Sequence, residues 1–166
     1  MKKEKIVTKT FDIQQSIKRA KDSKQNSYIW SIELQDKKYV WTSNMDRVAI
    51  IRKGLPYETF EFIGKRINIP VNQVLSIFGV PQTTYNKKRR EKSLLSGRDS
   101  EAVLMLTELI DFGIQVFNNE EEKFQRWLKK PNISLGGTSP ESLLDSITGI
   151  QEVKNCLSRL EYGNLA

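Results

Sequence analysis

The chain has 166 residues, of which 28% are charged and 38% hydrophobic, and its formal net charge is +7. This length suits one good hydrophobic core, or two small cores that share an element, so we expect a single domain with an appendage. No run of about 18 apolar residues and no signal-peptide pattern is present, which predicts a soluble, cytoplasmic protein without a membrane partner. The single Cys156 has no histidine in the chain to activate it, so thiol catalysis, disulfides and zinc frameworks are excluded.

The positive charge is concentrated in the first two thirds of the chain. Residues 1–117 contain 21 Lys/Arg and 13 Asp/Glu, whereas residues 118–166 contain 6 and 7. A basic surface favours a polyanionic partner. We therefore expect any nucleic-acid contact to lie before residue 118.

Residues 1–43 predict a basic arm that ends in a β-hairpin. Residues 1–26 are lysine-rich with few apolar positions, so we expect partial order at most. Aromatic and aliphatic residues then alternate with polar ones over 28–34, and 39–42 follow a short polar link. Such period-two alternation is typical of a hairpin. We expect its aromatic side chains to dock the arm onto the body instead of stacking on bases, because no basic residues are interleaved with them.

Helical spacing begins at Asn44, which we expect to cap a short helix that ends at Gly54. Pro56 is then predicted to start a second helix. Its apolar positions recur at the i, i+3, i+4, i+7 spacing of a buried face; they are Phe60, Ile63, Gly64 and Ile67. The glycine in this set suggests a close helix crossing.

A helix over residues 71–78, a stop at Gly79 and a second helix from Pro81 predict a helix-turn-helix. The second helix begins with small polar residues and ends in a basic run, and these side-chain types can read bases or grip phosphates in the major groove. The predicted DNA-binding residues are Gln82, Thr83, Thr84, Asn86, Lys87, Lys88, Arg89 and Arg90. The alternative is an ordinary solvated basic face. The basic run follows a compact helix pair directly, and this position favours DNA contact. We expect Tyr85 and Val80 to lie in the core.

A long helix is predicted from the Ser96–Asp99 capping box to about Asn118. Two of its faces are apolar, so both need cover. The core can cover one face and a partner subunit the other, although a central helix of a monomer fits the pattern equally well. A helix-turn-helix favours the homodimer, because the two half-sites of an operator need two recognition helices, one from each subunit. The predicted dimerisation residues are Leu106, Leu109, Ile110, Gly113 and Phe117.

The last third predicts a small helical unit. Asn119 is expected to open a helix with three glutamates in its first turn, which complement the helix dipole, and Pro131 to stop it. The glycine pair at 136–137 suggests positive φ angles or a close approach of another backbone segment. Residues 138–141 suggest the start of a new helix. Gly149 is expected to separate a final helix from the one before it.

A family resemblance emerges from the order of motifs in this region. They are Trp127-Leu128, Pro131-Asn132, Leu135-Gly136-Gly137, Ser139-Pro140, Leu143-Leu144-Asp145, Gly149, Val153 and Arg159-Leu160-Glu161-Tyr162-Gly163. Together they resemble the toxin-binding domain of the Xre/MbcA/ParS antitoxins. Upstream, Arg47, Gly54-Leu55-Pro56 and Phe60, with the helix-turn-helix and long helix, resemble the Xre-like N-terminal domain of that family. The resemblance covers about residues 45–163.

This resemblance implies a mainly α fold in three parts: an arm over 1–43, a helix-turn-helix and dimerisation domain over 44–118, and a toxin-binding domain over 119–166. It implies an antitoxin that neutralises a cognate RES-type toxin, a type associated with NAD degradation or ADP-ribosyl transfer. It also implies operator DNA binding that represses the antitoxin's own operon. The implied toxin-binding residues are Trp127, Pro131, Asn132, Leu135, Gly136, Gly137, Pro140, Leu144, Arg159, Glu161, Tyr162 and Gly163.

In such systems the C-terminal end of the antitoxin points at the active-site cleft of the toxin. No catalytic residue, metal or cofactor is implied. The long N-terminal arm departs from the family pattern, so its role is not carried over. Leu160, where the motif often has isoleucine, is a mild apolar exchange.

Two other functions compete with this interpretation. A stand-alone helix-turn-helix transcription factor, with a C-terminal domain that senses a ligand or protein, shares the same DNA-binding argument. A RES-like toxin gene immediately downstream would favour the antitoxin. An enzyme is disfavoured, because the chain has no coupled nucleophile and no phosphate-binding glycine motif.

Overall fold

The computed structural model describes residues 28–163, which form seven α-helices, two short 3-10 helices and one two-stranded sheet. The elements are β1 (Trp30–Glu33), β2 (Lys38–Trp41), α2 (Asn44–Lys53), α3 (Thr59–Ile67), α4 (Val71–Ile77), α5 (Gln82–Arg90), α6 (Gly97–Val116), α7 (Glu121–Lys129), η1 (Ile133–Leu135), η2 (Pro140–Leu143) and α8 (Ile147–Glu161). The expected mainly α fold with an N-terminal hairpin is confirmed. The partial order predicted for residues 1–26 lies outside the described residues.

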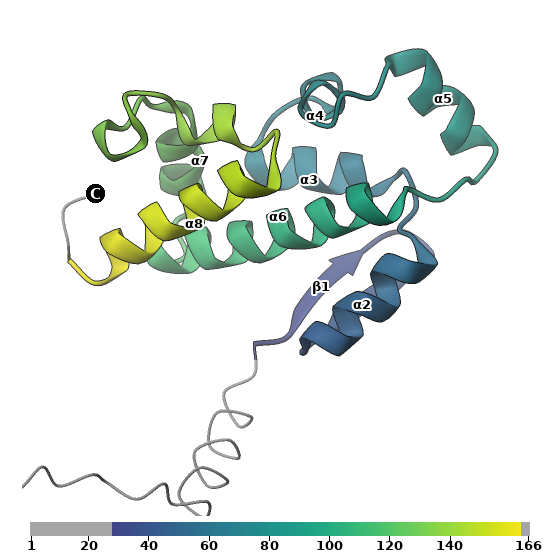
Figure 1. The fold of residues 1–166 in the computed structure, drawn as a ribbon, viewed down its shortest axis with the longest axis horizontal. Helices are drawn as coiled ribbons and strands as arrows, with labels where there is room; N and C mark the ends of the chain where they lie inside the picture. The colour runs from purple at the N-terminus through teal and green to yellow at the C-terminus, as the bar shows by residue number, and fades with distance from the viewer. Residues whose placement is uncertain (1–27, 164–166) are drawn as a thin grey trace, which may run out of the picture.

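Helix α6 is the centre of the molecule, with the other elements packed around it (Figure 1). Helix α8 lies along α6, α3 packs on another side, and the hairpin and α2 lie below. Buried apolar side chains from Ile32 to Leu157 form one continuous core. The helix-turn-helix and the C-terminal elements therefore share α6 as a common support.

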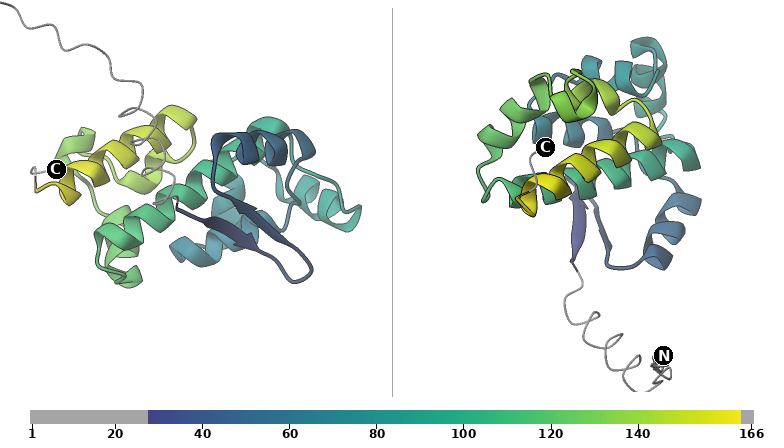
Figure 2. Two further views of the ribbon diagram at one scale, coloured as in Figure 1. Left: turned by 90° about the horizontal axis from the view of Figure 1, so that it is seen from below. Right: turned by 60° about the vertical axis from the view of Figure 1, so that its left-hand side comes forward.

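The β-hairpin docks on the body through its inner face. The strands pair antiparallel with Trp30 opposite Trp41, and Figure 2 (left) shows both strands beside α2. Trp41 is 1% exposed, and its indole Nε1 donates a 2.8 Å hydrogen bond to Oε1 of Glu108 on α6. Arg47 Nε lies 3.4 Å from the same oxygen, as an ion pair without hydrogen-bond geometry. The predicted docking role of the aromatic residues is confirmed for this tryptophan.

Replacing Trp41 by phenylalanine is expected to lower the free energy of unfolding by about 1–3 kcal/mol, because it leaves a buried carboxylate without its donor. Urea denaturation measures this change. The control is Val40→Thr, one residue away on the exposed outer face of the hairpin, 46% exposed. Equal stability of Trp41→Phe and the wild-type chain would show that the indole hydrogen bond contributes nothing.

Two predicted helix starts are shifted in the structure. Ser43, not Asn44, caps α2; its extended backbone and the reciprocal side chain of Asp46 complete a capping box. Pro56 does not start a helix, because its backbone forms an isolated β-bridge with Leu94, and α3 begins only at Thr59. Beside this bridge the backbone N–H of Leu95 donates to the carbonyl of Leu55 at 2.7 Å.

Glycines set the close approaches around the helix-turn-helix. A Cβ at Gly64 would lie 2.8 Å from the carbonyl oxygen of Ile69. The close approach expected at this glycine is present, but it is to the segment that leads into α4 and not to a crossing helix. Gly79 ends α4 with φ +64°, a value that glycine adopts freely. Pro81 then caps α5 in an extended conformation.

The residues predicted to form a dimer seam on α6 belong to the core of the single chain, which corrects that assignment. Leu106, Leu109 and Ile110 are each 1% exposed, because the chain's own helices cover both apolar faces of α6. Gly113 is buried against the ring of Phe124, which fills the space a side chain would need. Phe117 packs on the same ring with a centroid separation of 6.0 Å.

The turns of the C-terminal region also differ from prediction. Asn119 does not cap α7, because it and Asn118 both adopt left-handed backbone angles, and Glu120 becomes the cap residue. Only a 3-10 helix, η2, follows Ser139. Gly149 lies inside the first turn of α8, which Ser146 caps, and does not separate two helices.

Candidate functional site

Helix α5 is attached to the body along one face. Tyr85 is 2% exposed, and its hydroxyl donates a 2.8 Å hydrogen bond to Glu61 Oε1 on α3. Burial, with the hydrogen bond and charge of that carboxylate, raises the pKa of the tyrosine hydroxyl, which therefore stays protonated. The guanidinium of Arg89 lies 3.0 Å from the same oxygen. Arg89, one of the predicted DNA-binding residues, thus points back towards α3.

The rest of the α5 surface is polar and mostly exposed. Gln82 donates from Nε2 to Oδ1 of Asn86, 3.1 Å away, and Arg90 Nε donates to the Asn86 backbone carbonyl. The side chain of Lys87 is 69% exposed. Thr83 and Thr84 are exposed as well, whereas Lys88 is half-buried. Spacing by four residues aligns Gln82, Asn86 and Arg90 in one ridge, which suits insertion into a major groove.

Helix α5 and the C-terminal elements lie at opposite ends of the molecule. In Figure 1, α5 is at the upper right, whereas α7, the loop that contains η1 and the C-terminal end of α8 are at the left. The left-hand view of Figure 2 keeps the two groups apart in the same way. Two macromolecules could therefore be held at once, one at each end.

The loop over residues 131–137 is closed by backbone and side-chain hydrogen bonds. Asn132 donates from its backbone to the carbonyl of Thr138 at 2.9 Å, and its own carbonyl accepts from Gly137 at 2.9 Å. Its side chain accepts from the backbone of Ser134 and donates to Sγ of Cys156 on α8. Gly136 and Gly137 adopt φ of +70° and +79°. The predicted positive φ angles are confirmed, while a Cβ at either glycine would meet open space.

The residues implied for toxin binding divide by burial. Leu144 and Pro140 are buried, and Trp127 packs against Phe124 with a ring separation of 6.2 Å, so these residues support the loop and α8 from within. Asn132, Leu135 and Arg159 are half-buried. The exposed members are Pro131, Gly136, Gly137, Glu161, Tyr162 and Gly163.

Ile133 is the residue that sequence analysis missed. Its side chain is 94% exposed at the start of η1. An apolar residue between turn-forming neighbours gives no periodic signal, because one position cannot define a helical or strand face. Only the three-dimensional loop reveals that it points outward.

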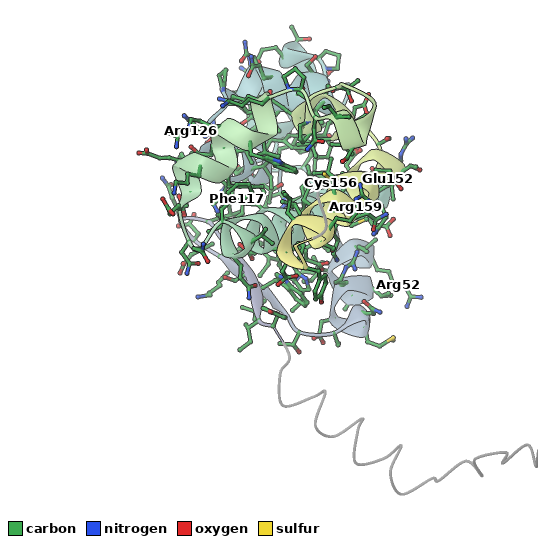
Figure 3. All side chains as sticks on the ribbon, turned by 90° about the vertical axis from the view of Figure 1, so that its left-hand side faces the viewer. Arg52, Phe117, Arg126, Glu152, Cys156 and Arg159 are labelled. Atoms are coloured by element: carbon green, nitrogen blue, oxygen red, sulfur yellow. The ribbon has the colours of Figure 1, made fainter. Side chains whose placement is uncertain are left out.

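Figure 3 views this end of the molecule. Phe117 lies between α6 and α7, and Arg126 is at the outer surface of α7. Cys156 faces the interior from α8, where burial raises the pKa of its thiol. A buried thiol with a raised pKa is a poor nucleophile. Its role here is to pack beneath the 131–137 loop.

Residues 28–163 contain no group of three His, Cys, Asp or Glu side chains placed to hold a metal ion. Within the same residues, no helix is both long enough and apolar enough to cross a membrane.

The paired helices α4 and α5, with a polar exposed face on the second, define a helix-turn-helix protein. The family model described as the antitoxin Xre-like helix-turn-helix domain matches residues 46–107. A second model, the antitoxin Xre/MbcA/ParS C-terminal toxin-binding domain, matches residues 113–163. The chain belongs to the Xre/MbcA/ParS-type antitoxins. It is therefore a toxin-neutralising, DNA-binding antitoxin with a C-terminal toxin-binding domain.

Three curated proteins are similar over most of the chain. Antitoxin Xre from Photorhabdus laumondii is 28% identical over 115 residues, which are 69% of this chain and 78% of the relative. Antitoxin Xre from Yersinia enterocolitica is 28% identical over 116 residues, 70% of this chain and 78% of the relative. A Prs ADP-ribosylating antitoxin from Sphingobium is 27% identical over 132 residues, 75% of this chain and 83% of the relative.

Proposed function

We propose that this antitoxin neutralises a RES-type toxin, which degrades NAD or transfers ADP-ribose, and that it represses its own operon by binding operator DNA. The observation that carries this proposal is the separation of the exposed face of α5 from the loop at 131–137 and the end of α8. The relative from Sphingobium, named a Prs ADP-ribosylating antitoxin, supports a toxin with ADP-ribose chemistry.

Neutralisation is assigned to the C-terminal end of the chain. Tyr162 is 77% exposed, and Glu161 and Gly163 beside it are exposed as well. An exposed segment that follows a helix can enter a cleft without unfolding the helix that carries it. We propose that this end obstructs the active site of the toxin, while the buried residues of α7, η2 and α8 hold it in position.

Co-expression with the adjacent gene product tests this assignment. We expect a stable complex to purify, and the toxin separated from that complex to consume NAD until the antitoxin is added back. If the adjacent product neither bound the chain nor acted on NAD, a RES-type partner would be ruled out.

Operator binding as a homodimer follows from the helix-turn-helix, because palindromic half-sites need two readers. Leu106, Leu109 and Ile110 are covered within one chain, so such a dimer uses another surface. Light scattering of the free antitoxin is expected to give twice the monomer mass. If the antitoxin were a monomer and bound its operator tightly, the proposal that it binds the operator as a homodimer would be wrong.

Alanine at both Lys87 and Arg90 is expected to weaken operator binding and to flatten its salt dependence. Both are exposed basic residues of α5 whose contacts do not involve Glu61: Lys87 lies 4.0 Å from the carboxylate of Glu91, and Arg90 donates to a backbone carbonyl. They are therefore available to neutralise phosphates. The slope of log affinity against log salt should become shallower by about 0.9 for each phosphate that the variant no longer neutralises. Fluorescence anisotropy with the promoter DNA of its own operon, over a salt series, measures both effects.

Lys130→Ala is the matched control, since it removes one positive charge from an exposed lysine at the other end of the molecule. It should leave the salt slope unchanged. If the Lys87 and Arg90 variant bound like the wild-type chain at every salt concentration, α5 would not be the operator-reading helix.

A further inference from the structure

Ile133 is the most exposed large hydrophobic side chain among residues 28–163, at 94%. It follows Asn132, whose backbone pairs with Thr138, and it precedes Gly136, whose backbone N–H donates to the Ile133 carbonyl at 3.1 Å. Its backbone is thus fixed on both sides. An exposed isoleucine on a fixed loop keeps apolar surface in water, which burial in a partner would remove.

Two further hydrogen bonds hold the loop in place. The hydroxyl of Thr138 donates to the carbonyl of Leu135 at 2.8 Å, and the Asn132 side chain joins the loop to Cys156 in the middle of α8. Leu135 packs against the core from the inner side of the loop. A pre-formed loop loses little conformational entropy on binding, so more of the burial energy of its apolar residue appears as affinity.

The position of the loop indicates which partner it meets. The loop and the C-terminal end of α8 lie together at the end of the molecule opposite α5 (Figures 1 and 2). Residue 133 also lies within the region matched by the toxin-binding family model, residues 113–163. DNA bound at α5 would be at the far end, and a charged phosphate backbone offers no apolar pocket.

We propose that Ile133 is an affinity-determining knob that inserts into an apolar pocket on the toxin surface, outside the active-site cleft. This inference rests on the proposed function, and it separates two roles at one end of the antitoxin. The knob holds the toxin, and the end beyond Leu160 obstructs its active site. Loss of the knob lowers affinity without removing the obstructing residues.

The test is Ile133→Ala, with the toxin encoded beside this chain as the immobilised probe and binding followed by interferometry. We expect the affinity to fall roughly 10- to 100-fold, the range for full burial of one aliphatic side chain. Most of the change should be in the dissociation rate. Ile133→Leu should restore most of the affinity, and at saturating concentration Ile133→Ala should still inhibit the toxin.

Ile147→Ala is the matched control. It makes the same truncation at an isoleucine of α8 that is 37% exposed and lies at the far end of that helix from the loop. Its toxin affinity should stay within about twofold of wild type, and thermal unfolding should confirm that both variants are folded.

Three results would overturn the proposal. If Ile133→Ala bound the toxin within twofold of wild type, the proposed role of Ile133 in affinity would be wrong, while the proposed function would stand. If light scattering showed that Ile133→Ala dissociates an oligomer of the free chain, Ile133 would cover a second copy instead. If the wild-type chain did not bind this toxin, the proposed function would fail together with the knob.

Discussion

Alanine at Gly149 is expected to lower the free energy of unfolding by about 3 kcal/mol, at the upper end of the range for overpacked sites. A Cβ at this position would overlap the backbone carbonyl of Leu143, the last residue of η2. A backbone atom cannot move aside as a flexible side chain can, so η2 and the start of α8 would have to separate. For a domain of this size the melting temperature should fall by roughly 6–12 °C, which calorimetry measures.

Gly136→Ala provides the comparison for that result. Gly136 has φ +70°, but nothing lies within 4 Å of an added Cβ, so alanine there costs only the left-handed backbone conformation, about 1 kcal/mol. The expected order of stability is therefore wild type, then Gly136→Ala, then Gly149→Ala. If Gly149→Ala were as stable as Gly136→Ala, η2 and α8 could not be packed as closely as described.

Deletion of residues 161–166 is expected to abolish inhibition of the toxin while much of the binding is retained. Among residues 28–163, Leu160 is the last that packs against the core, so a chain ending there keeps α8 through Leu160 together with its packing. The deleted part contains the exposed Glu161 and Tyr162. With the proposed knob intact, toxin affinity should stay within about tenfold of wild type, but NAD consumption should return to the rate of free toxin.

The full-length Tyr162→Ala variant, which keeps the length of the chain, accompanies the deletion. It should inhibit partially, because the remaining residues still occupy the cleft. A deletion variant that inhibited as well as the full chain would remove the obstructing role of this end. The loop would then be left as the whole inhibitory contact.

Much of the fold could be predicted because apolar periodicity reports burial directly. Phe60, Ile63 and Ile67 were predicted on one face of a helix, and all are buried on α3. The hairpin and the helix-turn-helix followed from equally regular patterns. Each of these predictions rests on several residues that agree with one another.

The incorrect predictions concern features set by tertiary contacts. Periodicity revealed that α6 is apolar on two faces, but it could not say whether α8 or a second chain covers the second face. Asn119 and Gly149 both resembled helix boundaries by composition. One instead forms a left-handed turn, and the other lies inside a helix where a neighbouring carbonyl leaves no room for a side chain.

The candidate sites were predictable as segments and not as individual residues. The run at 82–90 indicated a basic polar helix, but only the structure pairs Arg89 with Glu61 and leaves Lys87 exposed. Motif order likewise pointed to the C-terminal region, where Pro140 and Leu144 prove to be buried. The direction of a single side chain depends on its neighbours in space, which local sequence does not specify.

Operator affinity and toxin inhibition, measured on the same preparations of three proteins, test the central claim that two separate ends of this antitoxin serve two partners. The proteins are the wild-type chain, the Lys87→Ala/Arg90→Ala variant and the chain lacking residues 161–166. We predict that the first variant loses operator binding and inhibits the toxin fully, and that the deletion binds operator normally and no longer inhibits. Loss of both activities in either folded variant would contradict the separation of the two functions.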